Sequence, residues 1–153
     1  MRKIFLNLAL CFIAAAVCSG APNPMIGKWK LNQGKSKLTP DGPKNHTVVY
    51  APAGDNVKVT VDGTDKAGKA THNEWTGKFD GKDYPVTGDT MSDSRSYKMV
   101  NGNTLEITLK KNKKVTGTGR IVASPDGKTR TVTINGTNPE GKKFSSTAVY
   151  DKK

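Results

Sequence analysis

Turn-forming clusters interrupt this chain about every ten to twelve residues, and this spacing constrains its fold more than any other feature. The clusters combine Pro, Asp, Asn and Gly, which supply the fixed or positive φ values that tight turns need. They lie at 40–42, 52–55, 62–68, 80–81, 101–102, 125–127 and 138–141. Only short helical pieces, at 22–24 and 35–37, fit between them. The sequence therefore predicts an all-β domain built from hairpins.

Between the turns, apolar and polar residues alternate with the period of a β-strand. In 57–61, for example, three valines share one face while Lys58 and Thr60 share the other. One apolar and one polar face per strand are typical of a sheet closed on itself or of two packed sheets. The pattern predicts an antiparallel meander of about eight to ten strands. We expect them near 26–31, 45–51, 56–62, 70–79, 83–87, 93–100, 103–110, 113–123, 128–136 and 142–151.

Two stretches of the chain are similar to each other. Aligning Val48–Ala70 with Ile121–Lys143, at an offset of 73 residues, gives identical residues at nine of 23 positions. A duplicated hairpin or two similar turns would each explain this. In either case, both stretches are predicted to have the same strand–turn–strand shape.

The first twenty residues have the layout of a secretory signal peptide. A basic start, Met1-Arg2-Lys3, precedes an apolar segment at 4–17 and small residues at 18–21. The apolar segment is too short to remain as a transmembrane helix. We therefore predict a cleaved signal over 1–20, a single domain over 21–153, and a secreted or periplasmic protein whose mature form has no transmembrane segment.

Both cysteines, Cys11 and Cys18, lie in this signal, so the mature domain would have no disulfide. A lipoprotein signal prefers a small residue before its cysteine and a leucine three positions before it. Val17 and Ala15 occupy those positions here. Cleavage between 19 and 21 is therefore favoured over a lipid anchor at Cys18.

The chain is strongly basic, with 25 Lys and Arg against 13 Asp and Glu. Removing Arg2 and Lys3 with the signal leaves 23 basic residues. Most lysines lie beside predicted turns, where they keep strand edges soluble. No dense basic tract contains the interleaved aromatics that single-stranded nucleic acid would need. Nucleic acid is not expected as a partner, whereas an anionic envelope polymer or a protein partner of the basic exterior stays an alternative.

The predicted first strand begins with Gly27-Lys28-Trp29, which resembles the Gly-x-Trp pattern of lipocalins and the wider calycin group. The resemblance implies a closed barrel with Gly27 and Trp29 as a structural plug at one end. A basic side chain from a late strand, Arg120 or Arg130, would cover the indole. Residues 27–32 and 77–86 also look like small exported bacterial proteins of unknown role. The second lipocalin motif and the C-terminal helix are absent, so we expect a lipocalin-like barrel.

The barrel interior is the predicted ligand site. Trp75 and Phe79 share one face of the strand at 70–79, Arg95 and Tyr97 share one face of the next long strand, and Tyr150 lies in the last strand. Small residues on these faces indicate either a cavity or barrel corners. We expect these five residues to line a pocket for a small apolar or amphipathic ligand, anionic rather than cationic, with Trp29 as its floor.

The prediction for Arg95 is the most specific of these, because a buried guanidinium needs a carboxylate partner. A ligand carboxylate, held by Arg95 and the hydroxyl of Tyr97 or Tyr150, would supply it. The alternatives are a rim position beside Asp93, or an ion pair with Asp83 or Glu74.

No pattern indicates catalysis, so we expect a protein that is not an enzyme and has no catalytic residue. The mature chain has no thiol and only two histidines. His72 and Glu74 share a strand face opposite Trp75, where an exposed, solvated pair is expected. The spacing of His, Cys and acids predicts neither a transition-metal nor a calcium site, and no cofactor is expected.

Overall fold

The computed structural model describes residues 22–40 and 42–153. The predicted signal peptide lies outside these residues. The strands are β1 (Gly27–Leu31), β2 (Lys44–Ala53), β3 (Asn56–Thr64), β4 (Ala70–Gly77), β5 (Tyr84–Thr87), β6 (Ser94–Asn101), β7 (Thr104–Lys111), β8 (Lys114–Ala123), β9 (Thr129–Thr137) and β10 (Lys143–Lys152). A short 3-10 helix, η1, covers Gln33–Lys35, two residues before the helical piece expected at 35–37. The described residues include no helix with the length and apolar character to cross a membrane.

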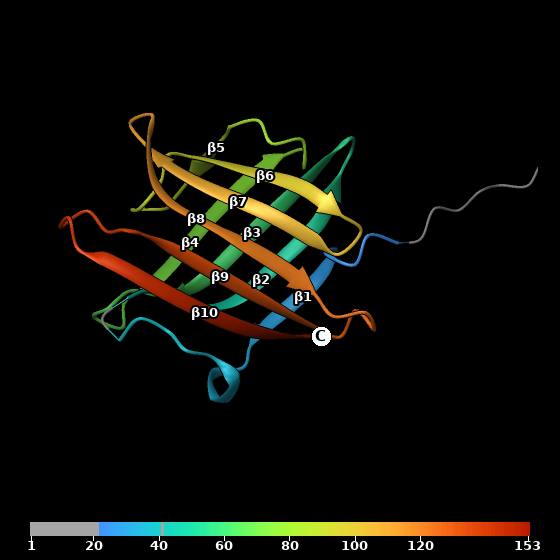
Figure 1. Ribbon diagram of the computed structural model, residues 1–153, viewed down its shortest axis with the longest axis horizontal. Helices are drawn as coiled ribbons and strands as arrows, with labels where there is room; N and C mark the ends of the chain where they lie inside the picture. Colours follow the sequence, from blue (N-terminus) through green and yellow to red (C-terminus); the bar gives the residue numbers. More distant parts are fainter. Residues whose placement is uncertain (1–21, 41) are drawn as a thin grey trace, which may run out of the picture.

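The ten strands form an antiparallel meander that closes into a barrel, as predicted (Figure 1). Each strand pairs with its neighbours in sequence, and β1 closes the sheet by pairing with both β2 and β10. Trp29, for instance, lies opposite Val48 on one side and Lys152 on the other. Closure removes the free sheet edges that would otherwise invite pairing with another chain. The fold is a lipocalin-like barrel.

The meander gives the barrel two distinct ends (Figure 1). Connections β1–β2, β3–β4, β5–β6, β7–β8 and β9–β10 lie at one end, which we call the loop end. The start of β1, the end of β10 and the other connections lie at the opposite end, which we call the termini end. This division decides which turns surround each opening of the barrel.

The two similar stretches have the same strand–turn–strand order, as predicted, and share one turn in detail. Asp65 and Asn138 each begin a five-residue connection at the loop end. Their side-chain Oδ1 atoms accept hydrogen bonds from backbone amides two and four residues later. The preceding connections differ, because β2 and β3 are joined by two residues and β8 and β9 by five.

The core fills the barrel from the termini end toward its middle. It consists of inward-facing apolar and aromatic side chains, of which Trp29, Val59 and Leu105 are fully buried. Two arginines, Arg95 and Arg130, are buried with them. Burial of a charged side chain is costly unless the charge is paired. These two arginines are therefore the candidate functional residues of the barrel interior.

Candidate functional site

Arg95 points into the barrel at the loop end and forms an ion pair with Asp89. Strand β6 sets its direction. Arg95 lies on the face of the strand opposite to the exposed Lys98, and it pairs with the buried Leu109 of β7. Asp89 comes from the β5–β6 loop, which covers 88–93. The Arg95 Nη2 atom lies 2.9 Å from Asp89 Oδ2, and the two side chains are only 7% and 15% exposed. The carboxylate that Arg95 needs is thus supplied by this chain.

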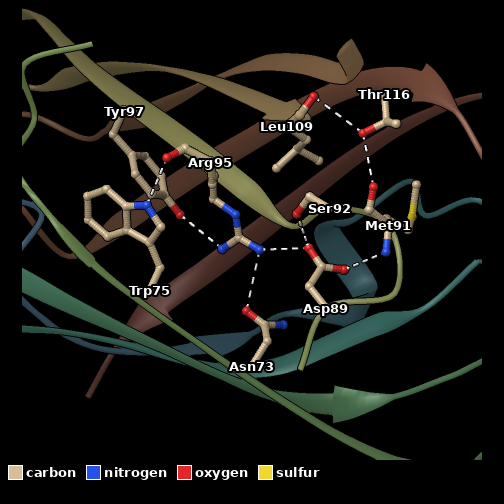
Figure 2. A network of polar contacts seen from close by, with 9 residues as sticks. All are labelled: Asn73, Trp75, Asp89, Met91, Ser92, Arg95, Tyr97, Leu109 and Thr116. Atoms are coloured by element: carbon tan, nitrogen blue, oxygen red, sulfur yellow. Dashed lines mark hydrogen bonds and ion pairs between the residues drawn. The ribbon is translucent and has the colours of Figure 1, made fainter. Parts of the chain in front are cut away.

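The β5–β6 loop is held across the barrel mouth by a polar network (Figure 2). The Asp89 carboxylate accepts hydrogen bonds from the Met91 amide at 2.9 Å and from the Ser92 hydroxyl. Thr116 Oγ1, on β8, donates to the Met91 carbonyl at 3.0 Å. Gly88 permits the loop to begin here, because its φ is +78° and a Cβ would overlap the His72 carbonyl.

Arg95 makes further contacts that fix its orientation. Its Nη1 donates to Tyr97 Oη at 3.3 Å, and its Nη2 lies 3.4 Å from Asn73 Oδ1. Its own carbonyl accepts from Trp75 Nε1 at 2.8 Å. Burial by itself lowers the pKa of Arg95, but Tyr97 and Asp89 raise the pKa above its ordinary value, so the group stays charged.

An aromatic cluster packs beside Arg95 in the middle of the barrel. The ring centroids of Trp75 and Tyr97 are 4.7 Å apart in an edge-to-face arrangement. Phe79 stacks on Trp75 at 6.4 Å, although β4 ends at Gly77 rather than at 79 as predicted. Tyr50 closes the cluster, 6.1 Å from Tyr97. Such geometries stabilise the pairs beyond their buried area, so this part of the interior is packed.

Arg130 is the second buried cation, and it lies at the termini end. Its guanidinium is 4.8 Å from the ring of Trp29, 4.6 Å from Tyr50 and 5.1 Å from Tyr150. Its Nε and Nη1 atoms have no hydrogen-bond partner in the described part of the chain. Of the two arginines expected to cover the indole, it is therefore Arg130 that does so. Arg120 points outward and pairs with Glu106 at 3.0 Å.

Trp29 is fully buried and has two cations, those of Arg130 and Lys152, close to its ring. Lys152 Nζ lies 5.1 Å from its ring, and its Nε1 donates to the Met25 carbonyl at 2.9 Å. Tyr150, which also contacts Arg130, directs its hydroxyl to the Asn45 carbonyl at 3.1 Å. Burial raises the pKa of Tyr150 to about 12, so the hydroxyl remains a donor.

The structure brings together four of the five residues expected to line the pocket. Trp75, Phe79, Arg95 and Tyr97 share one cluster, whereas Tyr150 lies beside Arg130 and is joined to that cluster only through Tyr50. The three carboxylates considered as alternative neighbours of Arg95 have other partners. Asp83 pairs with Lys110 at 2.6 Å, Glu74 pairs with Lys58 at 2.9 Å, and Asp93 accepts from the Asn112 amide at 2.7 Å.

Sequence reasoning missed Asp89 and Tyr50. The sequence carried a signal for Tyr50, because it is two residues from Val48 and therefore shares its face of β2, which is the buried one. Asp89 carried none, because it belongs to an irregular loop whose path is fixed by the close approach of Gly88 to β4 and by the hydrogen bond from Thr116 of β8.

Solvent reaches part of the inner wall at the loop end. On β9 and β10, the inward positions follow from alternation with the buried Arg130 and Ala148. Four of them are only half-buried: Val132, Ile134, Phe144 and Ser146. Three of these are apolar, and Val132 and Ile134 pack against the core. This stretch is therefore a partly exposed, mainly apolar part of the inner wall.

The cluster around His72 lies on the outer surface of β3 and β4. His72 Nδ1 is 2.6 Å from Asp62 Oδ1, and its Nε2 is 3.4 Å from Glu74 Oε1. All three side chains are exposed to a large extent, as expected for His72 and Glu74. Within 22–40 and 42–153, no group of three or more His, Cys, Asp or Glu is arranged to hold a metal ion.

Comparison with known proteins supports the fold. No protein-family model matches the chain, and no curated protein matches it. The structure is similar to that of EF1p2_mFAP2b bound to DFHBI, with a TM-score of 0.51 and 10% identity over 85% of this chain and 94% of that chain. It also matches a redesigned β-barrel, b11L5F_LGL, with a TM-score of 0.46 and 13% identity over 85% and 92% of the two chains. The likeness at a TM-score of 0.51 shows a shared barrel fold.

Proposed function

We propose that this protein is a non-enzymatic, exported binding protein for a small single-chain amphiphile with an anionic head group. One observation carries the proposal: Arg95 is buried in the barrel, and its carboxylate partner, Asp89, belongs to a loop rather than to the barrel wall. A buried positive charge without a counter-ion is unfavourable. An anionic ligand could supply that counter-ion in place of Asp89.

The head group is placed at Arg95, where it would replace Asp89. A carboxylate there would accept hydrogen bonds from the guanidinium in the same way as Asp89. The β5–β6 loop would move outward with its carboxylate. Because Asp89 is held by a few polar contacts at the barrel mouth rather than by apolar packing, the exchange requires no change in the strands.

The apolar tail is placed along the accessible inner wall of β9 and β10. Val132, Ile134 and Phe144 are half-buried and present apolar surface there. The packed aromatic cluster of Trp75, Phe79 and Tyr97 would bound the site on the opposite side, and Trp29 would close the barrel below it. The layout of residues 1–20 supports action outside the cytoplasm.

The DFHBI complex of the similar barrel agrees with this proposal, since it has a small molecule bound to a protein of this fold. Our proposal for this chain depends on its own interior charges, because the two sequences share only 10% identity.

The test is a fluorescence titration of the lipid-stripped mature protein with 11-(dansylamino)undecanoic acid and with its methyl ester. The wild type should prefer the acid. Asp89→Asn removes the competing charge and should bind the acid about tenfold more tightly, whereas its affinity for the ester should stay constant. Asp93→Asn, which makes the same change in the same loop, is the control and should behave like the wild type.

Arg95→Gln completes the test, because it should abolish the preference for the acid over the ester. Equal binding of acid and ester by the wild type would contradict an anionic head group. Saturable binding of neither probe would contradict a ligand site in the barrel. Native mass spectrometry of the exported protein would then identify any co-purifying ligand by mass.

A further inference from the structure

Lysines gather at the loop end of the barrel. Lys69, Lys113, Lys114, Lys142 and Lys143, which we call the rim lysines, lie in or beside the β3–β4, β7–β8 and β9–β10 turns. All five are exposed. None lies within ion-pair distance of a carboxylate in the part of the chain that the structure describes. The loop end therefore presents positive charge that no described neighbour neutralises.

Two of the turns are joined to each other, which brings their lysines together. Lys66 of the β3–β4 turn pairs with Glu140 of the β9–β10 turn at 3.1 Å. The β7–β8 turn lies next to them, because β8 pairs with β9 through Gly117 and Gly136. In Figure 1 these three turns lie on the same side of the molecule. The rim lysines thus form one basic surface around part of the mouth.

The β7–β8 turn uses a lysine where glycine would be less strained. Asn112 and Lys113 have φ values of 49° and 65°, in the left-handed region. Turns of this kind favour Asn-Gly, because a side chain at the second position is unfavourable there. Strain of this kind points to a role beyond the turn itself. Here it keeps a charged side chain at the tip of the hairpin.

An apolar side chain lies next to this charge. Val115, which follows Lys114 in β8, is 58% exposed, more than the other exposed large apolar residues, Val100 and Val122. Lysines beside an exposed apolar side chain match the two parts of a membrane interface, anionic head groups and the edge of the acyl region. A soluble anionic polymer would use the lysines but leave Val115 in water.

We propose that the loop end docks on the surface of an anionic lipid bilayer. The rim lysines would lie over the head groups, and Val115 would reach the interface. The surface differs from the ligand site in the barrel, and binding to it requires no ligand. Docked in this way, the mouth of the barrel would face the lipid.

The test is partition of the ligand-free mature protein onto vesicles of phosphatidylcholine with about 30% phosphatidylglycerol, which have an anionic surface like that of a natural leaflet. Partition is measured by co-sedimentation. Lys113→Gln/Lys114→Gln should lower the partition coefficient about tenfold or more, because each basic side chain near an anionic leaflet contributes a factor of about five. Lys142→Gln/Lys143→Gln, which leaves the strained turn unchanged, should have a similar effect.

The matched control is Lys78→Gln/Lys82→Gln, which removes two exposed lysines from the β4–β5 connection at the termini end. It should change partition less than twofold. Val115→Ser should weaken binding even where high salt has already screened the lysines. Equal losses in the rim and control variants would overturn a specific surface. Binding to heparin without binding to vesicles would overturn the membrane in favour of an anionic polymer, and retention on both surfaces independent of salt would overturn the electrostatic basis.

Discussion

The Arg130 guanidinium stacks over the indole of Trp29, with 4.8 Å between its central carbon and the ring centroid. This contact joins the first strand to the ninth, which are separated by about a hundred residues in sequence and by β10 in the sheet. Desolvated cation–π contacts are stronger than exposed ones. The contact therefore helps to hold the barrel closed at the termini end.

Replacing Arg130 by Lys should be strongly unfavourable, although the charge is kept. The ammonium cannot lie flat against Trp29, Tyr50 and Tyr150 as the guanidinium does. We expect a loss of about 2 kcal/mol in the free energy of unfolding, measured by urea denaturation. Arg120→Lys, on the outer surface, is the control and should change stability by less than about 0.5 kcal/mol. Equal effects of the two variants would argue against a stacking role for Arg130.

Arg95 and Asp89 should be energetically coupled. Arg95→Met leaves the Asp89 carboxylate without its partner and should cost about 3 kcal/mol in the free energy of unfolding. The double variant Arg95→Met/Asp89→Asn should recover part of this loss, because no unpaired charge remains. A double-mutant cycle from urea unfolding measures the coupling. Additive effects would show that the pair contributes nothing to stability.

Gly77 should not tolerate a methyl group. A Cβ at this position would lie 2.5 Å from the Tyr84 ring and 2.7 Å from the Trp75 ring. Because these rings belong to a packed cluster, the added methyl group of Gly77→Ala should overpack the interior. We expect a loss of about 1–3 kcal/mol in the free energy of unfolding and a lower thermal midpoint. Gly102→Ala is the control, since no atom lies within 4 Å of its Cβ position. An unchanged midpoint in Gly77→Ala would mean that the interior can expand.

Lys113→Gly should stabilise the protein by about 1 kcal/mol, because it removes a side chain from a left-handed conformation. Lys114→Gly, one residue later in the extended β8, should destabilise the protein, because glycine loses more conformational freedom on folding into a strand. Chemical denaturation of both variants measures the difference. A stability gain together with weaker vesicle binding would show that the turn gives up stability for its surface role. A destabilised Lys113→Gly would contradict the strain.

His72 should make stability depend on pH. Its hydrogen bond with Asp62 raises the pKa of His72 above 6.5, with a smaller contribution from Glu74. Since the folded pKa lies above the unfolded value, the stabilisation is fully present below pH 6.5 and is lost as pH rises through the folded pKa. Urea midpoints between pH 5.5 and 8.5 should show this small decrease in the wild type only. His72→Gln should remove it, and a slope that persists would assign it to another group.

The strand pattern was readable from sequence because it depends on local chemistry. Alternating residues place one face of each strand inside, and Gly, Pro, Asn and Asp permit the turns. Each strand boundary in the structure therefore lies within two residues of its predicted position. Phe79 differs from the prediction, because it was expected within the strand at 70–79 but packs in the core from beyond the end of β4.

Side-chain partners were not readable in the same way. The sequence indicated that Trp29 would be buried beneath an arginine and that Arg95, if inward, would need a carboxylate. It could not choose between Arg120 and Arg130, nor identify Asp89. Those choices depend on strand register and on the path of one loop, and both are set by contacts between residues far apart in the chain. The sequence by itself determined the all-β meander through local periodicity, whereas only closure of the barrel decided which charges meet inside it.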